Sequence, residues 1–484
     1  MHSVRKRWKV GQTAGKVISN GILWELFFHF HCKISLFARL CLFTVHLFYQ
    51  CSISAHSLSY LFYKGFLCLC DCSIAFSLLS GDDDDVIKIK VKPEDFGVDE
   101  VADIPYDKNG DFGIFFLKKS GWNTVDVLQR LSKRIKAPFS DFSYGGRKDK
   151  YALTTQYISV ARGRCKQILN VPSQQPMPQA GAEFTENSYS LRFMGFMERP
   201  MAPEFIKGNR FSITVRNLAD DDVKSAVNEL AFVKKEGYPN YFDDQRFGSF
   251  DDRQGFIAEK IVRGHYNGAL KIYFTRFHPA DNKEEKEHKK LLDGVWGDWP
   301  LCLNAASTGF ERESFEYLMR NPKGFIPILQ RIHYEEMSIF FSAFQSYLWN
   351  TLLRKVVESA AKDAVRVHKG MVEDYSFYKQ IDAEGFNYLQ GLSLPTPASN
   401  TRMPDGLTES LYSELLTTHG IKPAWFNIKS IRQAFFKCVE RKAIVFPGDL
   451  LDEQAGDEIY SGKKKLVLRF FLPRGSFGTM LIKR

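Results

Sequence analysis

The sequence has few cysteines, and their distribution suits neither a disulfide framework nor a zinc site. Only nine of the 484 residues are cysteine, and six of these precede residue 81. The closest group, Cys68, Cys70 and Cys72, has no second pair of ligands to complete a tetrahedron. This scarcity argues against a disulfide-stapled secreted domain and against a structural metal. We therefore expect an intracellular protein that binds no metal.

The motifs of the common nucleotide-binding and hydrolytic enzymes are also missing. The nearest match to a P-loop, residues 11–16, is one residue short and has no hydroxyl-bearing residue after its lysine. No GxGxxG follows an expected strand, and neither a GxSxG elbow nor an HExxH helix occurs. The sequence therefore predicts no nucleotide cofactor and does not support hydrolase chemistry.

The main body of the chain has little excess of positive charge. The net charge of the whole chain is +10, but residues 1–80 contain eight basic and two acidic residues. Subtracting these from the totals of 66 and 56 leaves 58 basic and 54 acidic residues in residues 81–484, or +4. A polyanion such as RNA would therefore have to bind a local basic patch. The composition, 44% hydrophobic and 25% charged, is that of a globular chain of two or three domains.

Residues 1–80 form an atypical hydrophobic extension, rich in Phe, Leu, Ser and His. Their longest uncharged stretch, residues 40–63, could cross a bilayer, but Gln50 and several His and Ser residues interrupt it. No secretory cleavage pattern follows. A spurious upstream start, an organelle transit peptide and a genuine hydrophobic segment all fit this composition. We expect a cytoplasmic protein, or an organellar one if the segment is a transit peptide.

Hydrophobic periodicity predicts strands near both ends of residues 81–484 and helices between them. Strands are expected at residues 86–101, 113–117, 156–160, 189–196, 211–215, 465–472 and 477–483. Helices are expected at residues 123–135, 220–235, 251–263, 311–320, 335–361 and 408–418. The charged run 283–290 alternates in sign at helical spacing, which favours a solvated helix face over an RNA-binding site.

This order predicts an α+β fold in which one domain is interrupted by a mostly helical insertion. The first part of the interrupted domain would be residues 81–236 and its last part residues 448–484, with the insertion at residues 237–447. No internal repeat is seen.

One short segment, residues 145–156, could carry chemistry. Asp149 lies between Lys148 and Lys150, next to Arg147 and just after a Gly-Gly turn. Neighbouring cations favour the ionised carboxylate, which keeps Asp149 available as a nucleophile or base near neutral pH. A solvated charged loop fits the same residues.

This segment resembles the active-site motif of the TruD family of RNA pseudouridine synthases, in which Gly-x-Lys-Asp is followed by Ala, Thr and Gln. Further matches occur in the order of the family's motifs: Lys92–Phe96 with Val98 and Glu100, Lys207–Phe211, Pro239–Gly248, Ser342–Ser346 and Leu472–Thr479. Six ordered matches cover most of residues 86–484 and are far more specific than one motif. Residues 1–80 match nothing in the family.

The resemblance implies a pseudouridine-synthase-type catalytic domain with a mixed, mainly antiparallel sheet, interrupted by a TRUD-type helical domain. It implies an isomerase that breaks the N1–C1′ bond of a uridine in structured RNA, turns the base and rejoins it through C5. Such a reaction needs no cofactor. The expected partner is RNA, with the D-arm of transfer RNA as the target, and the expected oligomeric state is a monomer.

By the same resemblance, Asp149 is the catalytic carboxylate, either attacking C1′ of the ribose or removing its C2′ proton. Lys90 aligns with a basic position of the family, and Lys88 and Lys92 are its rivals. Three lysines on one solvent face of a strand would fit the same pattern.

The resemblance also places substrate contacts on Phe96, Asn209, Phe211 and Phe477. Asn209 can donate and accept hydrogen bonds at the edge of uracil, and aromatic rings can stack on a base. Phe211 stands where other pseudouridine synthases generally have tyrosine. Candidate RNA contacts are Arg147, Lys148 and Arg246, although Arg246 could equally form a hinge between domains.

Two positions depart from the family's pattern. Gly478 stands where the family often has alanine. Asp243 and Asp244 stand where the family more usually has a pair of small residues or of glutamates. Two other functions fit parts of the sequence. One is a noncatalytic RNA-binding or RNA-folding protein on the same fold, and the other is a membrane-tethered protein whose functional part is residues 1–80.

Overall fold

The computed structural model describes residues 86–484 except 173, 177–178, 187, 279–280 and 363. The described residues form one compact unit. The expectations for residues 1–80 lie outside the described residues. In the part of the chain that is described, no helix is both long and apolar enough to cross a membrane.

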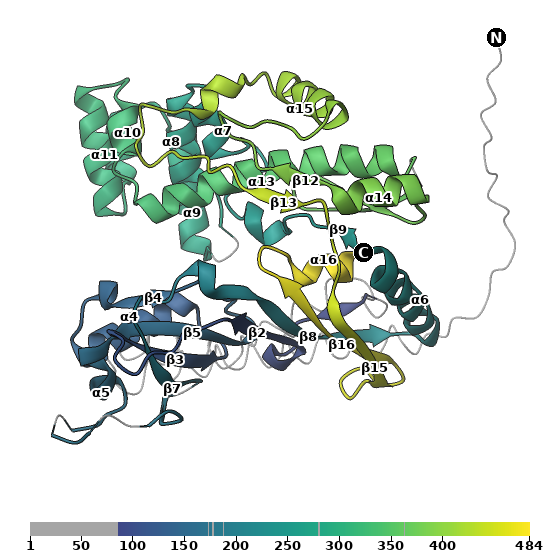
Figure 1. The fold of residues 1–484 in the computed structure, drawn as a ribbon. Helices are drawn as coiled ribbons and strands as arrows, with labels where there is room; N and C mark the ends of the chain where they lie inside the picture. The colour runs from purple at the N-terminus through teal and green to yellow at the C-terminus, as the bar shows by residue number, and fades with distance from the viewer. Residues whose placement is uncertain (1–85, 173, 177–178, 187, 279–280, 363) are drawn as a thin grey trace, which may run out of the picture. The chain divides into compact units, whose positions relative to one another are not determined.

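One mixed sheet of ten strands organises the two ends of the described chain (Figure 1). Its strands are β1 (Lys88–Ile89), β2 (Phe96–Ala102), β3 (Phe112–Lys119), β4 (Phe142–Tyr144), β5 (Leu153–Ala161), β6 (Glu183–Glu186), β7 (Tyr189–Met197), β8 (Ile206–Leu218), β15 (Gly448–Gly456) and β16 (Lys464–Pro473). The main order is β15-β16-β8-β2-β5-β3-β7-β6, with β1 on β8 and β4 on β5. Among the strands that the structure describes, only β2 and β5 pair in parallel. The predicted mixed, mainly antiparallel sheet is confirmed.

The long strand β8 joins the two ends of the chain in this sheet. It pairs with β2 on one side and with β16 on the other, so that Phe211 lies opposite both Val98 and Phe470. Phe211, Ile213 and Val215 share one face of the strand and are all buried, and on the other face Arg216 is buried as well. The sheet thus places β2 and β16, from the two ends of the described chain, on either side of β8.

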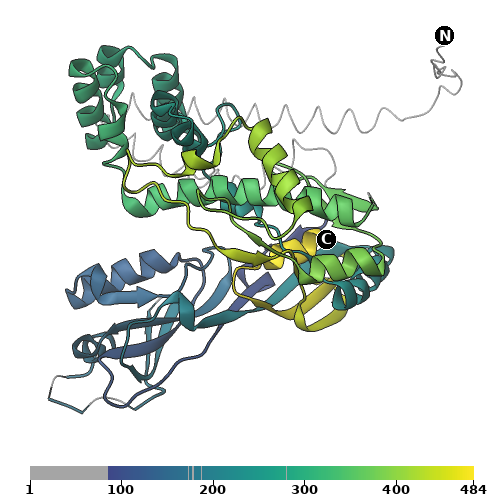
Figure 2. The same cartoon turned by 45° about the horizontal axis from the view of Figure 1, so that its top comes forward.

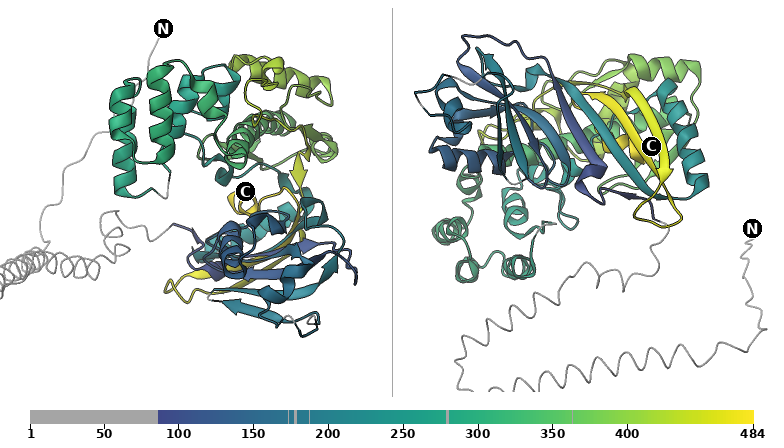
Figure 3. Two further views of the ribbon diagram at one scale, coloured as in Figure 1. Left: turned by 90° about the vertical axis from the view of Figure 1, so that its left-hand side faces the viewer. Right: turned by 90° about the horizontal axis from the view of Figure 1, so that it is seen from below.

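Two amphipathic helices cover parts of the sheet. α4 (Thr124–Ile135) buries Val127, Leu128 and Leu131 in a core shared with β3 and β5. α6 (Asp220–Glu236) packs on β8, β15 and β16, beside which it lies in Figure 3. These contacts bury the apolar stripe of each helix.

Helices dominate between residues 239 and 444 (Figures 1 and 2). They are α7 (Ile257–Val262), α8 (Tyr266–Thr275), α9 (Lys283–Gly294), α10 (Trp299–Ala305), α11 (Gly309–Arg320), α12 (Phe325–Leu329), α13 (Tyr334–Ala360), α14 (Ala383–Gly391) and α15 (Gly406–Thr418). α13 is the central helix of this region and buries residues along its whole length.

Three small antiparallel strand pairs complete this region. They are β9 (Tyr238–Pro239) with β14 (Ile444–Val445), β10 (Val365–His368) with β11 (Tyr375–Tyr378), and β12 (Ser393–Pro395) with β13 (Glu440–Lys442). The β9–β14 pair holds the two ends of the helical region side by side.

Three expected elements are wrong in detail. The strand expected over residues 86–101 is interrupted, because Lys90 adopts a left-handed backbone (φ 59°) and the 3-10 helix η1 (Pro93–Asp95) follows. The helix expected from residue 251 begins only at Ile257, after a tight turn over residues 251–255. The strand expected at residues 477–483 is helix α16 (Gly478–Lys483). In a short apolar run such as residues 477–483, periodicity alone does not distinguish a helix from a strand.

Candidate active site

Asp149 lies in the loop between β4 and β5, and a buried lysine holds the backbone of this loop. Lys119, at the end of β3, is 1% exposed. Its Nζ donates to the carbonyl oxygens of Trp122 and Asp149, both at 2.8 Å. Burial lowers the pKa of Lys119 to about 8, and the nearby Asp149 carboxylate opposes this shift. The loop is therefore anchored and is not a freely solvated turn.

A second set of hydrogen bonds fixes the start of the loop. Thr124 Oγ1 accepts from the backbone N–H of Lys148 at 3.1 Å and donates to Oε1 of Gln156 at 2.7 Å. Nε2 of Gln156 donates to the carbonyl oxygen of Gly146 at 3.1 Å. The Thr and Gln side chains are both buried, so the motif glutamine has a structural role in positioning the loop.

The Asp149 carboxylate accepts three hydrogen bonds. Oδ2 accepts from Lys90 Nζ at 2.6 Å and from Gln245 Nε2 at 3.2 Å, and Oδ1 accepts from the backbone N–H of Tyr151 at 3.0 Å. Burial raises the pKa of Asp149. The hydrogen bond and charge of Lys90, together with the hydrogen bonds from Tyr151 and Gln245, lower this pKa by more than burial raises it, so the net shift is downward. The group is a half-buried carboxylate that stays ionised at neutral pH.

Lys90 reaches Asp149 because of its left-handed backbone, which turns the chain between β1 and η1. Its Nζ also lies 4.2 Å from the centre of the Phe96 ring, a cation–π distance. Lys92 points elsewhere, since its Nζ pairs with Glu458 at 3.1 Å. Of these two lysines, only Lys90 contacts the candidate catalytic acid.

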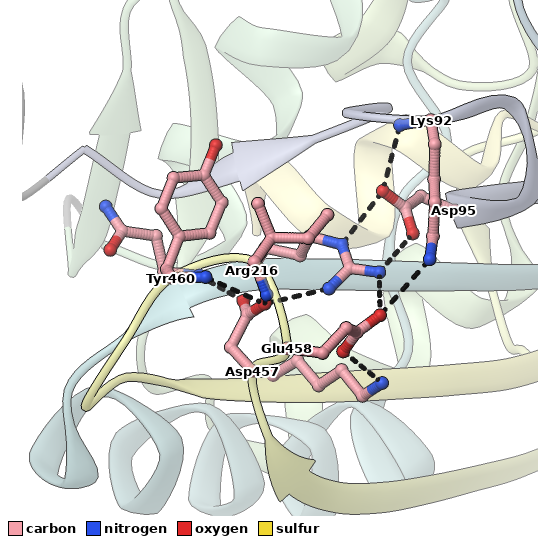
Figure 4. Close-up of polar contacts among 9 residues, drawn as sticks. Lys92, Asp95, Arg216, Asp457, Glu458 and Tyr460 are labelled. Carbon is pink, nitrogen blue, oxygen red and sulfur yellow. Dashed lines mark hydrogen bonds and ion pairs between the residues drawn. The ribbon is translucent and has the colours of Figure 1, made fainter.

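A buried arginine anchors the segment that carries Lys90 and Phe96 (Figure 4). Arg216, in β8, is 1% exposed. Its guanidinium donates twice to Asp95 at 2.8 and 2.9 Å, and once each to Asp457 and Glu458 at 2.9 Å. These carboxylates, led by Asp95, raise the pKa of Arg216. The cluster ties η1 to the turn between β15 and β16.

Asn209 and Lys148 belong to an internal polar chain. Lys148 Nζ donates to Asn209 Oδ1 at 2.6 Å and forms an ion pair with Glu100 at 2.9 Å. The Glu100 side chain is fully buried and that of Lys148 is 9% exposed. The Lys148 ammonium is thus committed to protein partners, which does not favour the phosphate contact expected for it. Asn209 keeps its amide NH₂ for another partner.

The three phenylalanines expected to contact the substrate all pack against other aromatic rings. Phe96 and Phe211 meet edge to face with centroids 6.4 Å apart, and Phe211 stacks on Phe470 at 5.3 Å. Phe477 packs edge to face on Phe242 at 6.0 Å. Phe96 and Phe211 are buried and Phe477 is half-buried. The first two expected substrate contacts therefore form a wall rather than an exposed platform.

The two arginines expected to contact RNA are both exposed. Arg147 forms an ion pair with Glu335 at the start of α13. Arg246 lies over the ring of Phe242 at 5.4 Å, one residue after the glutamine that contacts Asp149. Both cations border the candidate site and can reach solvent.

Comparison with known proteins identifies the family. The family model described as tRNA pseudouridine synthase D (TruD) matches residues 78–484. The chain belongs to the TruD family. A relative from Methanocaldococcus jannaschii, named as a tRNA pseudouridine synthase D, is 31% identical over 405 residues, which are 82% of this chain and 91% of that protein. The tRNA pseudouridine synthase D of Leptospira interrogans is 29% identical over 408 residues, covering 82% and 96%.

A solved TruD structure has the same fold. The crystal structure of a TruD protein from Methanosarcina mazei superposes with a TM-score of 0.59 at 24% identity, covering 82% of this chain and 92% of that chain. The predicted family and the predicted α+β fold class are therefore confirmed.

Both departures from the TruD pattern have a local explanation. Lys483, in α16, donates to Asp243 and Asp244 at 2.7 Å each, so one ammonium bridges the unusual acidic pair and compensates one of its two charges. A Cβ added to Gly478 would lie 2.8 Å from the Phe211 ring. Glycine therefore allows the Phe211 ring to pack directly against α16.

Sequence reasoning missed Lys119 and assigned no role to Gln245. Lys119 ends an ordinary strand, and nothing in its neighbourhood indicates that its ammonium lies under the TruD motif loop. Gln245 stands in the quoted Pro239–Gly248 motif, which was the only available signal. The part of the chain that the structure describes contains no group of three or more His, Cys, Asp or Glu residues that could hold a metal ion.

We expect Lys90→Met to reduce pseudouridine formation at neutral pH about 100-fold, the effect of removing one charge-stabilising group. The substitution should also raise the pKa of Asp149, because it removes the strongest interaction that lowers it. Only the ionised carboxylate can act as base or nucleophile. The acidic limb of the pH–rate profile should therefore move to higher pH, which initial rates between pH 4 and pH 8 would measure.

Lys92→Met is the matched control. It removes a lysine from the same segment, but one that pairs with Glu458 on the surface. Its pH–rate profile should coincide with that of the unsubstituted protein. An unchanged acidic limb in Lys90→Met would contradict the role given to the Lys90–Asp149 pair.

Proposed function

We propose that this protein isomerises uridine to pseudouridine in transfer RNA, with a uridine of the D-arm as the target. Membership of the TruD family supports the reaction, and the names of the relatives from M. jannaschii and L. interrogans support the substrate. The observation that carries the assignment to particular residues is the 2.6 Å contact between Lys90 and Asp149 in an anchored loop.

In this proposal Asp149 is the catalytic carboxylate. It either attacks C1′ of the flipped nucleoside or removes its C2′ proton, and the geometry is compatible with both. The detached uracil carries negative charge while it turns, and the Lys90 ammonium beside Asp149 is placed to stabilise that charge. The partly desolvated surroundings strengthen this interaction relative to water.

The uridine must leave the RNA stack to reach the site, at a cost of a few kcal/mol. Phe96 and Phe211 would line the side of the site, while Phe477 and the free NH₂ of Asn209 would contact the base. The exposed cations Arg147 and Arg246 would hold the RNA backbone. Lys148 would act indirectly, by fixing the Asn209 side chain.

Residues 81–236 and 448–484 would make up the catalytic domain and residues 237–447 the inserted domain. The short β9–β14 pair supports this division, because it closes the ends of the helical region on each other. The proposed enzyme acts as a monomer and needs neither a nucleotide cofactor nor a metal ion. It works in the cytoplasm, or in an organelle if residues 1–80 are a transit peptide.

Incubation with unmodified transfer RNA transcripts tests the function. Carbodiimide treatment and primer extension should reveal a new stop in the D-arm. A stop at another uridine would support pseudouridine formation but contradict the D-arm as the target. RNA binding without any stop would favour the noncatalytic RNA-binding protein. A chain lacking residues 1–80 should give the same stop, whereas loss of product on truncation would favour a function located in that segment.

A further inference from the structure

Residues 422–442, here called the basic strip, are unusually rich in positive charge. They contain six basic residues and one acidic residue. Their net charge of +5 exceeds the +4 of residues 81–484 as a whole. The strip is therefore the kind of local basic patch that a polyanion would need on this protein.

The cations of the strip have no carboxylate partners. Those at positions 422, 429, 432, 437 and 442 are exposed. Among the described residues none of these five forms an ion pair, whereas Lys289 and Lys290 of the charged helix α9 pair with Asp281 and Glu287. Their charges are thus free to meet an external anion.

The strip also exposes two aromatic rings between its cations. Phe435 is 70% exposed and Trp425 is 39% exposed. A single exposed apolar side chain is ordinary. Aromatic rings interleaved with unpaired cations, however, are the surface that binds single-stranded nucleic acid, because bases stack on the rings and phosphates meet the cations.

The backbone of the strip is held firmly against the helical region. Phe436 is buried and packs on Phe341 of α13 at 5.0 Å. Gln345 of α13 and Thr396 both donate to the carbonyl oxygen of Lys437, at 3.0 and 2.9 Å. The segment leading into β13 accordingly runs alongside α13 (Figure 1). With Phe436 buried, the backbone that carries the exposed Phe435 and Lys437 side chains is held in place, so ordering this backbone costs little on binding.

Near its end, the strip contacts two segments that carry motif residues of the family, residues 239–248 and 472–479. Arg441 Nη1 and Nη2 donate to the carbonyl oxygens of Gly475 and Asn240 at 2.5 and 2.6 Å. Its guanidinium lies 3.9 Å from the centre of the Phe242 ring, and Phe477 packs edge to face on the same ring. RNA lying on the strip would therefore extend toward Phe477, one of the expected substrate contacts.

We propose that the basic strip binds a segment of the substrate RNA outside the active site, with Phe435 stacking on an unpaired base and Arg432 and Lys437 contacting phosphates. This inference rests on the proposed function for the identity of the RNA. RNA recognition outside helices relies on unstacked bases of this kind.

Binding of the full-length protein to a fluorescently labelled, unmodified transfer RNA transcript tests the charges. The double variant Arg432→Ala/Lys437→Ala should bind about 10- to 100-fold more weakly, and its plot of log affinity against log salt should be shallower by about 1 to 2. The matched control, Arg320→Ala/Lys323→Ala, removes two exposed cations near the end of α11 and should stay within about twofold of the unsubstituted protein.

Substitutions of Phe435 test the stacking. Phe435→Ala and Phe435→Leu should each weaken binding about 5- to 100-fold, and Phe435→Trp should retain it, because only an aromatic ring stacks on a base. All three should unfold at the same temperature as the unsubstituted protein, since the ring is exposed. Full affinity in Phe435→Leu would overturn the stacking role and indicate an apolar contact instead.

The outcome for the strip is separable from that for the enzyme. If the unsubstituted protein makes pseudouridine while the double variant binds the transcript as the control does, the strip proposal fails and the proposed function stands. If the unsubstituted protein makes no pseudouridine but the strip variants lose affinity, the strip proposal stands and the enzyme proposal fails.

Discussion

Asp149→Asn should abolish pseudouridine formation, with a loss of at least about 1,000-fold, while transfer RNA still binds. The substitution preserves the size of the side chain but removes the negative charge that a nucleophile or base requires. The anchors of the loop, Lys119, Thr124 and Gln156, do not use the Asp149 carboxylate. The backbone should therefore keep its place, and single-turnover primer extension should show the loss at saturating protein.

Asp141→Asn is a matched control for this prediction. Asp141 is also an ion-paired carboxylate, 3.2 Å from Arg164, but has no contact with the candidate site. It should retain activity within about threefold, as expected for a surface pair. Appreciable pseudouridine from Asp149→Asn would refute the catalytic assignment, and joint loss of RNA binding would mean that the carboxylate mainly maintains the loop.

Arg216→Met should destabilise the protein by about 3–5 kcal/mol, because it leaves buried carboxylates without their cation. Asp95 is 1% exposed, and the Asp457 side chain is fully buried. Both lose charge-assisted hydrogen bonds that water cannot replace (Figure 4). The free energy of unfolding in urea would measure the effect. Arg216→Lys should recover only part of the stability, since an ammonium cannot make the paired contact with Asp95.

Arg210→Met controls for the loss of an arginine from the same strand. Arg210 is exposed and lies 3.5 Å from an exposed Asp449, so its removal should change the free energy of unfolding by less than about 1 kcal/mol. Equal stabilities of Arg216→Met and Arg210→Met would contradict the anchoring role. Because the cluster fixes η1 between Lys90 and Phe96, Arg216→Met should also lower activity at temperatures where the protein remains folded.

Local pattern was a good guide to elements with strong periodicity or clear boundaries. The helix expected at residues 123–135 is α4, and the alternation at residues 211–215 lies inside β8. The same reasoning failed at residues 477–483, where α16 packs Met480 and Leu481 into the core. A short apolar run is compatible with either a helix or a strand, and its tertiary neighbours decide between the two.

The expected site residues likewise differ in what their sequence context could show. The motif around Asp149 indicated a charged loop after a turn, because its residues are contiguous. Lys90 was one of three candidates, and its contact with Asp149 distinguishes it from Lys92, whose ammonium pairs with Glu458. The role of Lys148 depends on Glu100, which is 48 residues away and buried. Contacts of this kind leave no periodic signal in the chain.

By itself, the amino-acid sequence determined the family, the α+β class and the loop that holds Asp149, because ordered motifs and side-chain periodicity are properties of contiguous residues. The tertiary structure alone decided that Lys90 and Gln245 meet Asp149 and that Lys119 supports its backbone. It also decided that the exposed cations of residues 422–442 form no ion pair within the described part of the chain. Each of these facts depends on which distant side chains come within a few ångströms, and pairing, burial and charge compensation exist only once the chain has folded.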